Sequence, residues 1–289
     1  MSRKRGKNGE NKMNYKIVAD SAADTPLVFS VPFCTVPLKI STDSKEYVDD
    51  SGLDVHEMLS DLEKYKGRSR TACPSVGEYL KAFEGADRVF CVTITSGLSG
   101  SYNAAVVAAT QFMEENPGSR VCVIDSLSTG PENALIVEKI AELIGEGKDF
   151  EEIRAQVIAY KKRTRLVFIL ESLHNLANNG RVSPLVAKVA GILGIKIIGK
   201  ASDEGTLEIK KKSRGAKNVL IDVLRIIKGE GFKGGRVKIH HAENLEQAEI
   251  IKEKLLEDSP EAKIEISQTR GLCSFYAERG GVLLGFEVE

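Results

Sequence analysis

The stretch Val89-Phe-Cys-Val-Thr-Ile-Thr-Ser-Gly-Leu-Ser-Gly-Ser-Tyr-Asn-Ala104 predicts a strand, a tight polar turn and the start of a helix. Residues 89–94 are mostly apolar and rich in β-branched types, which indicates a strand covered on both faces. Residues 95–101 then hold four hydroxyl side chains and two glycines. Such a turn can present N–H groups and hydroxyls to an anion, and ligands of open α/β sheets bind where strands end. We therefore expect this turn to hold the anionic end of a small ligand.

Strand-like and helix-like segments alternate along the rest of the chain. The predicted strands are 15–19, 36–40, 88–94, 121–124, 166–170, 195–200, 206–212, 236–241, 263–267 and 282–288. The predicted helices are 53–65, 75–83, 103–115, 131–144, 150–162, 183–194, 215–228 and 245–256. This alternation predicts an α/β protein whose sheets are largely parallel or mixed and are flanked by helices.

The length of 289 residues predicts two domains. We expect a disordered basic lead over 1–14, an α/β domain with the polar turns over 15–170, and a second α/β domain over 171–289. The lead has no apolar core, so it is not expected to be a signal peptide. No segment is long and apolar enough to span a membrane, although transient contact with a membrane surface stays open.

The balanced charge argues against a nucleic-acid binder that relies on overall positive charge. Forty-one basic and 41 acidic residues give a formal net charge of zero, and there is no tryptophan. The five cysteines are odd in number, and no pair has the close spacing of metal ligands. These features indicate reduced thiols in a cytoplasmic protein without a metal site, with a catalytic Cys73 as a minor alternative.

Four polar turns are expected to meet at one edge of the sheet, because the carboxyl ends of parallel strands share an edge. They are Asp20-Ser21, Thr71 to Ser75, Thr95 to Ser101 and Asp125-Ser126. Neutral hydroxyls suit a weakly charged group such as one carboxylate. Alternatively, the serines in these turns serve only as helix caps.

Other chemistries have weaker support. Gly97-Leu-Ser-Gly100 is one residue shorter than a Gly-x-Ser-x-Gly elbow, and no nucleotide-binding glycine motif follows a strand. His240 and His241 are adjacent on a predicted strand, so their side chains point to opposite faces and are not expected to share a metal.

Two arginines follow or precede glycines in polar turns. Arg181 and Arg214 could each bind a carboxylate or a phosphate through a planar guanidinium group. A surface ion pair or a contact with a helix end is the alternative for either residue.

These motifs together resemble the DegV family of bacterial fatty-acid-binding proteins. The segments that carry the resemblance are Asp20-Ser21, Thr71-Ala-Cys-Pro-Ser75, Ile94-Thr-Ser-Gly-Leu-Ser-Gly-Ser-Tyr102, Val123-Ile-Asp-Ser126, Asn179-Gly-Arg-Val182 and Ser213-Arg-Gly215. The resemblance extends over about 15–289. Its most specific parts are the Ser-Gly-Leu-Ser-Gly stretch and the Thr-x-x-Pro-Ser turn.

The resemblance implies a two-domain α/β protein that buries one long-chain fatty acid, such as palmitate, stearate or oleate. It implies that Thr71 and Ser96 hold the carboxylate, and it places Gly97, Ser99 and Tyr276 at the same site. The protein would need no cofactor and would not be an enzyme by itself. Several members present the fatty acid to a separate fatty acid kinase for acyl-phosphate formation. The resemblance implies that Arg181 and Arg214 contact that partner or a phosphate.

The chain departs from the family pattern in two places. The family's His-x-Gly-Pro-Gly is here Tyr276-Ala-Glu-Arg-Gly280, in which Tyr276 could donate a hydrogen bond in place of the histidine. The family's Asn-Ile-Lys-Pro is here Gly194-Ile-Lys-Ile197.

A fatty acid needs a long apolar slot with a few polar groups at one end, and the apolar helix expected over 184–194 is a candidate wall. Two alternatives remain. One is an acyl- or phosphoryl-transfer enzyme that uses Ser96 or Ser99 as nucleophile. The other is a regulatory protein whose pocket is vestigial. Chain-length preference and oligomeric state cannot be inferred from the sequence.

Overall fold

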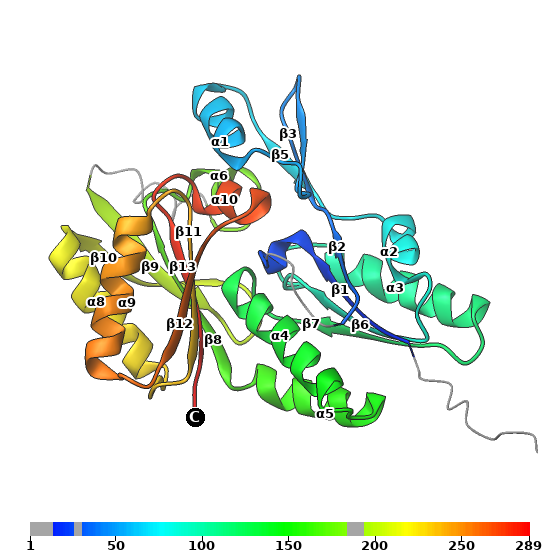
Figure 1. The fold of residues 1–289 in the computed structure, drawn as a ribbon. Coiled ribbons are helices and arrows are strands. Elements are labelled where there is room, and N and C mark those ends of the chain that lie inside the picture. Colours follow the sequence, from blue (N-terminus) through cyan, green and yellow to red (C-terminus); the bar gives the residue numbers. More distant parts are fainter. Residues whose placement is uncertain (1–13, 26–30, 184–193) are drawn as a thin grey trace, which may run out of the picture.

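The computed structural model describes residues 14–25, 31–183 and 194–289, and three sheets organise them (Figure 1). The first sheet has four strands in the order β2-β1-β6-β7, all parallel. Its strands are β1 (Tyr15–Asp20), β2 (Phe33–Val36), β6 (Arg88–Thr93) and β7 (Arg120–Asp125). Helices α2 (Val76–Phe83) and α3 (Ser101–Glu115) cover one face, and α4 (Pro131–Gly145) and α5 (Phe150–Lys161) cover the other. This part confirms the predicted parallel α/β architecture.

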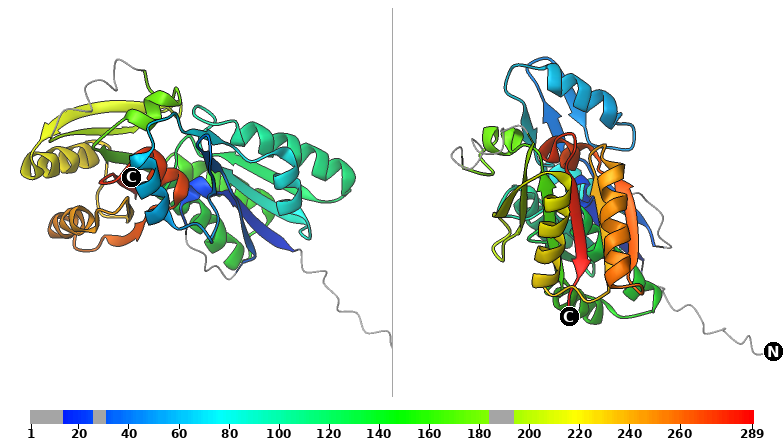
Figure 2. Two further views of the ribbon diagram at one scale, coloured as in Figure 1. Left: turned by 90° about the horizontal axis from the view of Figure 1, so that it is seen from above. Right: turned by 90° about the vertical axis from the view of Figure 1, so that its left-hand side faces the viewer.

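The second sheet has six strands in the order β10-β9-β8-β13-β11-β12. Its strands are β8 (Thr164–Leu170), β9 (Ile195–Ala201), β10 (Leu207–Arg214), β11 (Arg236–His241), β12 (Lys263–Gln268) and β13 (Val282–Glu287). Only β11 and β12 pair in parallel, so the sheet is mixed. Helices α8 (Ala216–Gly229) and α9 (Leu245–Asp258) lie side by side on its outer face (Figure 2).

Strand β8 ends at Leu170, where the first domain was expected to end. It pairs with β9 and β13 and so belongs to the second sheet. The apolar pattern of 166–170 predicts a buried strand correctly. It carries no information about which strands will be its neighbours, because that depends on pairing across the chain.

The third sheet is small and antiparallel, and the sequence pattern did not predict it. It consists of β3 (Lys39–Ser41), β4 (Glu46–Val48) and β5 (Arg70–Ala72), with α1 (Val55–Lys64) beside it. A single strand was expected over 36–40, but the chain leaves β2 at Pro37 and starts β3 in another sheet. Strands of three residues are too short to show a period of two.

Helix α4 lies between the two large sheets and packs against both (Figure 1). Ile136 and Ile140 of α4 are fully buried in the core of the first sheet. On the other side, Gly285 of β13 lets the helix start approach closely, since a Cβ there would lie 2.5 Å from the Glu132 nitrogen. An ion pair between Glu138 and Lys238 adds a polar contact. The two sheets are therefore held against a common helix.

Three predicted helix starts are confirmed. Ser75 and Asp149 both form capping boxes, with Glu78 and Glu152 respectively, and Pro131 is the first residue of α4. Each such cap contributes on the order of 1 kcal/mol. The predicted helix over 183–194 falls almost entirely outside the described residues. Two short helices were not predicted: α6 (His174–Asn178) and α10 (Gly271–Ala277).

Candidate functional site

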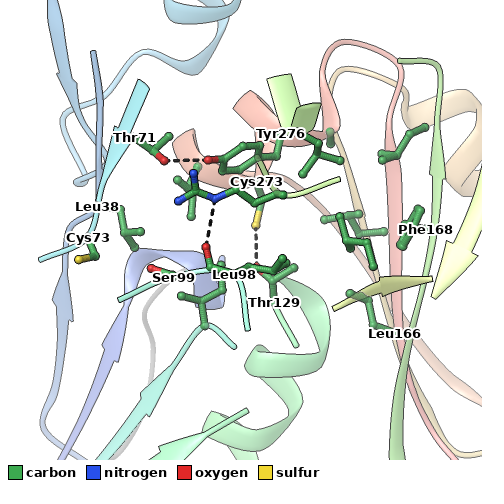
Figure 3. A pocket seen from close by; sticks show the side chains of 18 of the residues that line it. Leu38, Thr71, Cys73, Leu98, Ser99, Thr129, Leu166, Phe168, Cys273 and Tyr276 are labelled. Atoms are coloured by element: carbon green, nitrogen blue, oxygen red, sulfur yellow. Dashed lines mark hydrogen bonds between the residues drawn. The ribbon is translucent and has the colours of Figure 1, made fainter. Parts of the chain in front are cut away.

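A cavity of about 310 Å³, called the main cavity below, lies between the two large sheets (Figure 3). Its described lining is largely apolar. It consists of Leu38, Thr71, Ala72, Cys73, Ile94, Leu98, Ser99, Gly100, Thr129, Leu166, Phe168, Leu170, Leu176, Arg181, Leu207, Leu272, Cys273, Tyr276, Ala277 and Leu283. Both the turn after β6 and the inner face of the six-stranded sheet contribute. The volume is at the lower end of the range of about 300–1,000 Å³ for ligand pockets.

The alternation of β8 explains the apolar wall. Leu166, Phe168 and Leu170 point to the main cavity, whereas Val167 and Ile169 pack into the core beneath α8 and α9. Successive side chains of a strand point to opposite faces, so one strand supplies both surfaces. Leu166 and Phe168 lie across the cavity from Thr71 and Cys73 (Figure 3).

The polar end of the main cavity is built from elements far apart in the sequence. Thr71 on β5 and Tyr276 on α10 share a hydrogen bond of 2.7 Å between their hydroxyl oxygens (Figure 3). The Arg181 Nε donates to the Leu98 carbonyl at 3.1 Å, which ties this cation to the turn after β6. Ser99 of the same turn also lines the cavity. This end of the main cavity thus holds the hydroxyls of Thr71, Tyr276 and Ser99 and the guanidinium group of Arg181.

The Tyr276 phenol remains a hydrogen-bond donor at neutral pH. Burial raises its pKa above the ordinary value, while the hydrogen bond from Thr71 and the positive charge of Arg181 act in the opposite direction. Arg181 affects this pKa because its guanidinium group lies close to the Tyr276 phenol. This end of the cavity therefore offers neutral O–H donors beside one positive charge.

Two buried aspartates hold α10, and with it Tyr276, in place. Asp49 accepts hydrogen bonds from the backbone nitrogens of Gly271 at 2.8 Å and Leu272 at 2.9 Å. Asp24 accepts one from the Arg270 nitrogen at 2.6 Å. Burial raises the pKa of Asp49 to about 6, although these N–H donors favour the charged form. Sequence reasoning missed Asp49, because nothing near it in the chain marks its partner.

Ser96 and Gly97, which the family resemblance places at the carboxylate site, are not among the described residues that line the main cavity. Ser96 is exposed, its Oγ donates to Asp125 and its backbone nitrogen donates to the same carboxylate at 3.1 Å. Gly97 instead lies against the turn between β9 and β10, where an added Cβ would be 2.9 Å from the Gly205 carbonyl oxygen. The turn presents Leu98, Ser99 and Gly100 to the cavity, whereas the Thr95 hydroxyl donates to the Gly205 carbonyl and the Ser96 hydroxyl to Asp125.

The predicted convergence of polar turns occurs, but part of it is structural. The Ser101 Oγ donates to Asp20 Oδ2 at 2.6 Å and lies 2.6 Å from the Tyr79 hydroxyl. Asp20 also accepts from the Ile94 nitrogen at 2.9 Å. These contacts fasten the end of β1 to the turn before α3. Ser75 is the helix cap that the alternative expected, whereas Ser101 is the first residue of α3 and bonds to Asp20 and Tyr79 instead.

The two candidate arginines do not share a site. Arg181 lines the main cavity, whereas Arg214 is exposed at the end of β10 and is not part of the described lining. Cys73 is exposed and lines the cavity near Gly100, where an added Cβ would lie 3.3 Å from its sulfur.

No histidine is found among the described residues that line the main cavity. The His240 Nδ1 lies 3.2 Å from Asp24 Oδ2, and His241 accepts a hydrogen bond from the Asn244 nitrogen. A nucleophilic Ser99 would therefore have no imidazole base in this lining, and the Ser96 hydroxyl, outside the described lining, donates to Asp125. Across residues 14–25, 31–183 and 194–289, no group of three His, Cys, Asp or Glu side chains is placed to hold a metal ion. Within the same ranges, no helix has the length and apolar character needed to cross a membrane.

Comparison with known proteins gives a family match. The model of the DegV family matches residues 14–287. A DegV domain-containing protein of Streptococcus pneumoniae is 42% identical over 282 residues, which cover 96% of this chain and 100% of that protein.

Two solved structures are similar throughout. A DegV family protein of Eubacterium eligens, loaded with heptadecanoic acid, is 46% identical with a TM-score of 0.93, over 95% of this chain and 100% of the other. The Fatty Acid Kinase (Fak) B3 protein of Streptococcus pneumoniae, loaded with linoleic acid, is 42% identical with a TM-score of 0.94, over 96% and 100%.

Proposed function

This chain belongs to the DegV family, and we propose that it binds one long-chain fatty acid, such as palmitate, stearate or oleate, in the main cavity. The observation that carries the proposal is the polarity of the lining. Among the described residues there, Arg181 is the only charged side chain, and it lies at the same end as the hydroxyls of Thr71 and Tyr276. The leucines and Phe168 supply an apolar surface for the acyl chain.

The energetics support this assignment. Burying each methylene contributes about 0.8 kcal/mol before the costs of association. A carboxylate taken from water without partners would cost several kcal/mol, so donors are required at one end. One positive charge and neutral hydroxyls match a singly charged head group.

We assign the carboxylate to Thr71, Ser99, Tyr276 and Arg181. This set differs from the one implied by the resemblance, because Ser96 and Gly97 are directed elsewhere. Arg181 changes role in this proposal, from a partner contact to a ligand of the fatty acid. The guanidinium group also contacts the turn that carries Ser99, so it can order both parts of the site.

We further propose that the protein presents the carboxylate to a separate fatty acid kinase and uses no cofactor. Cys73 and Gly100, at the polar end, are exposed, whereas Leu166 and Phe168 at the far end are fully buried. A partner would therefore reach the carboxylate before the tail. The Streptococcus pneumoniae neighbour is named as a fatty acid kinase protein, which supports this class of partner. Arg214 on the exposed end of β10 is the residue we assign to partner contact.

Native mass spectrometry of the purified protein tests the proposal. We expect a mass increase equal to one fatty acid, which organic extraction should release and identify. Delipidated protein should regain the mass when oleate or palmitate is added. A protein that carries no fatty acid and binds neither added acid would refute the proposed function. Turnover of acyl esters without a partner would favour the enzyme alternative instead.

A further inference from the structure

Leu166 separates the main cavity from a second cavity of about 290 Å³, called the rear cavity below. It is the only described residue that lines both. Its side chain is 2% exposed and points from β8 toward the main cavity, at the end opposite Thr71 (Figure 3). Leu166 therefore occupies the place where the methyl end of a bound fatty acid would stop.

The rear cavity differs from the main cavity in chemistry. Its lining includes the charged residues Lys161, Lys162, Arg165 and Glu132. The Glu132 carboxylate is buried and accepts a hydrogen bond from the Thr164 hydroxyl at 2.8 Å. The Lys161 ammonium group donates to the Asp125 carbonyl at 2.8 Å. An acyl chain that entered this space would displace water from charged groups, which is unfavourable.

Phe168 forms the part of the wall beside Leu166, and its ring packs against Gly199 of β9. It pairs with Gly199 across β8 and β9, and a Cβ at Gly199 would overlap the Phe168 ring. The ring therefore lies over the glycine, where a larger residue would push it away. Phe168 therefore packs closely against β9 at this end of the cavity.

We propose that Leu166 ends the acyl slot and sets the longest fatty acid that the protein accepts, by closing an apolar cavity against a charged one. The inference rests on the proposed function, since it places the acyl tail in the main cavity. It assigns a specificity-determining role to a residue that has no contact with the carboxylate.

Binding of a saturated series, from dodecanoic to docosanoic acid, tests the inference. In the wild type, affinity should rise by about four-fold per methylene up to a limiting length and then fall. In Leu166→Ala, the limit should move to acids longer by at least two carbons. The matched control is Leu170→Ala, which changes the same residue type on the same face of β8. Leu170 lines only the main cavity, so its loss should weaken all lengths without moving the limit.

A fatty acid with a hydroxyl group on its last carbon tests where the end of the acyl chain lies. In Leu166→Ala, an ω-hydroxy acid longer than the wild-type limit should bind at least several-fold more tightly than the plain acid of equal length. Its hydroxyl would meet the polar groups of the rear cavity. Equal affinity of the two acids would contradict entry into that cavity.

An unchanged length limit in Leu166→Ala would overturn the inference while leaving the proposed function intact. A wild type that binds no acid of the series would overturn both. If Leu166→Ala does not fold, Leu166→Val removes one carbon only, and it should bind the first acid beyond the limit at least two-fold more tightly than the wild type does. No gain in that variant would also count against the inference.

Discussion

Thr71 and Tyr276 are 205 positions apart in the chain, yet their hydroxyls are 2.7 Å apart in the fold. Each hydroxyl has one proton to donate, so in this pair one proton is used internally and the other is available to a ligand. A carboxylate that approached the pair could accept from both groups once their mutual bond opened. Tyr276 thus offers a neutral O–H donor beside Thr71.

Removing either hydroxyl should weaken fatty-acid binding. We expect Thr71→Val and Tyr276→Phe each to cost about 1 to 3 kcal/mol, or roughly 5- to 150-fold in affinity, because the buried carboxylate loses a donor. Titration with a fluorescent or natural fatty acid measures the change. Thr71→Ser is the matched control, since it keeps the hydroxyl and should stay close to the wild type. Wild-type affinity in both test variants would refute this assignment of the carboxylate.

At the scale of elements, the shortest ones position the site. Strand β5 has three residues and α10 has seven, and neither shows a periodic pattern long enough to be predicted. Both are fixed by tertiary contacts: β5 pairs with β3, and α10 is held by Asp49 and Asp24. Phe275 of α10 also packs into the core beneath α1. The long helices and strands form the framework on which these small elements rest.

Asp20, which connects the end of β1 to Ser101 at the start of α3, makes the free energy of unfolding depend on pH. Burial raises the pKa of Asp20 to about 7, from an ordinary value of 3.8, against the opposing hydrogen bonds of Ser101 and Ile94. Between about pH 4 and pH 7 the folded state keeps a proton on Asp20 that the unfolded state has released. The free energy of unfolding should therefore fall as the pH rises through this window, by on the order of 4 kcal/mol at most.

Denaturant unfolding of the wild type and Asp20→Asn across this pH range measures the effect. The asparagine keeps an oxygen acceptor but cannot ionise, so the slope of stability against pH should be smaller in the variant. Some slope should remain, because burial also raises the pKa of Asp49, to about 6. Identical slopes in the two proteins would contradict the raised pKa of Asp20.

At the scale of the whole molecule, the main cavity joins the two large sheets. Its lining comes from the turn after β6 on one side and from β8, β13 and α10 on the other. A ligand there contacts both parts and is bound only when they are packed together. Binding should therefore stabilise the fold as a unit.

Removal of the fatty acid should lower the melting temperature. At a free ligand concentration 100 times the Kd, binding contributes about 2.7 kcal/mol, which corresponds to a shift of roughly 5 to 10 °C for domains of this size class. Calorimetry of delipidated protein with and without added oleate measures the shift. The fatty alcohol of equal length is the control and should give a smaller shift, since it lacks the carboxylate. An equal shift in melting temperature for the acid and the alcohol would contradict the assignment of Arg181 and the hydroxyls as ligands of the carboxylate.

Much of the framework could be predicted from local pattern. The apolar run before Thr95, the capping boxes at Ser75 and Asp149, and Pro131 at a helix start each depend on neighbours within a few residues. Most of the long strands and helices were therefore found at nearly their observed bounds. The pairing of β8 and the three-stranded sheet were not, because strand partners are chosen by contacts across the whole chain.

The sequence by itself determined the α/β class, the capped helix starts and the polar turns, because hydrophobic period and capping chemistry act over short distances. Only the tertiary structure decided which of those polar residues face a cavity. It turned Ser96 toward Asp125, brought Tyr276 to Thr71 and placed Arg181 beside them. The physical reason is that a side chain's direction depends on how its element packs, and a cavity exists only where distant elements fail to fill the space between them.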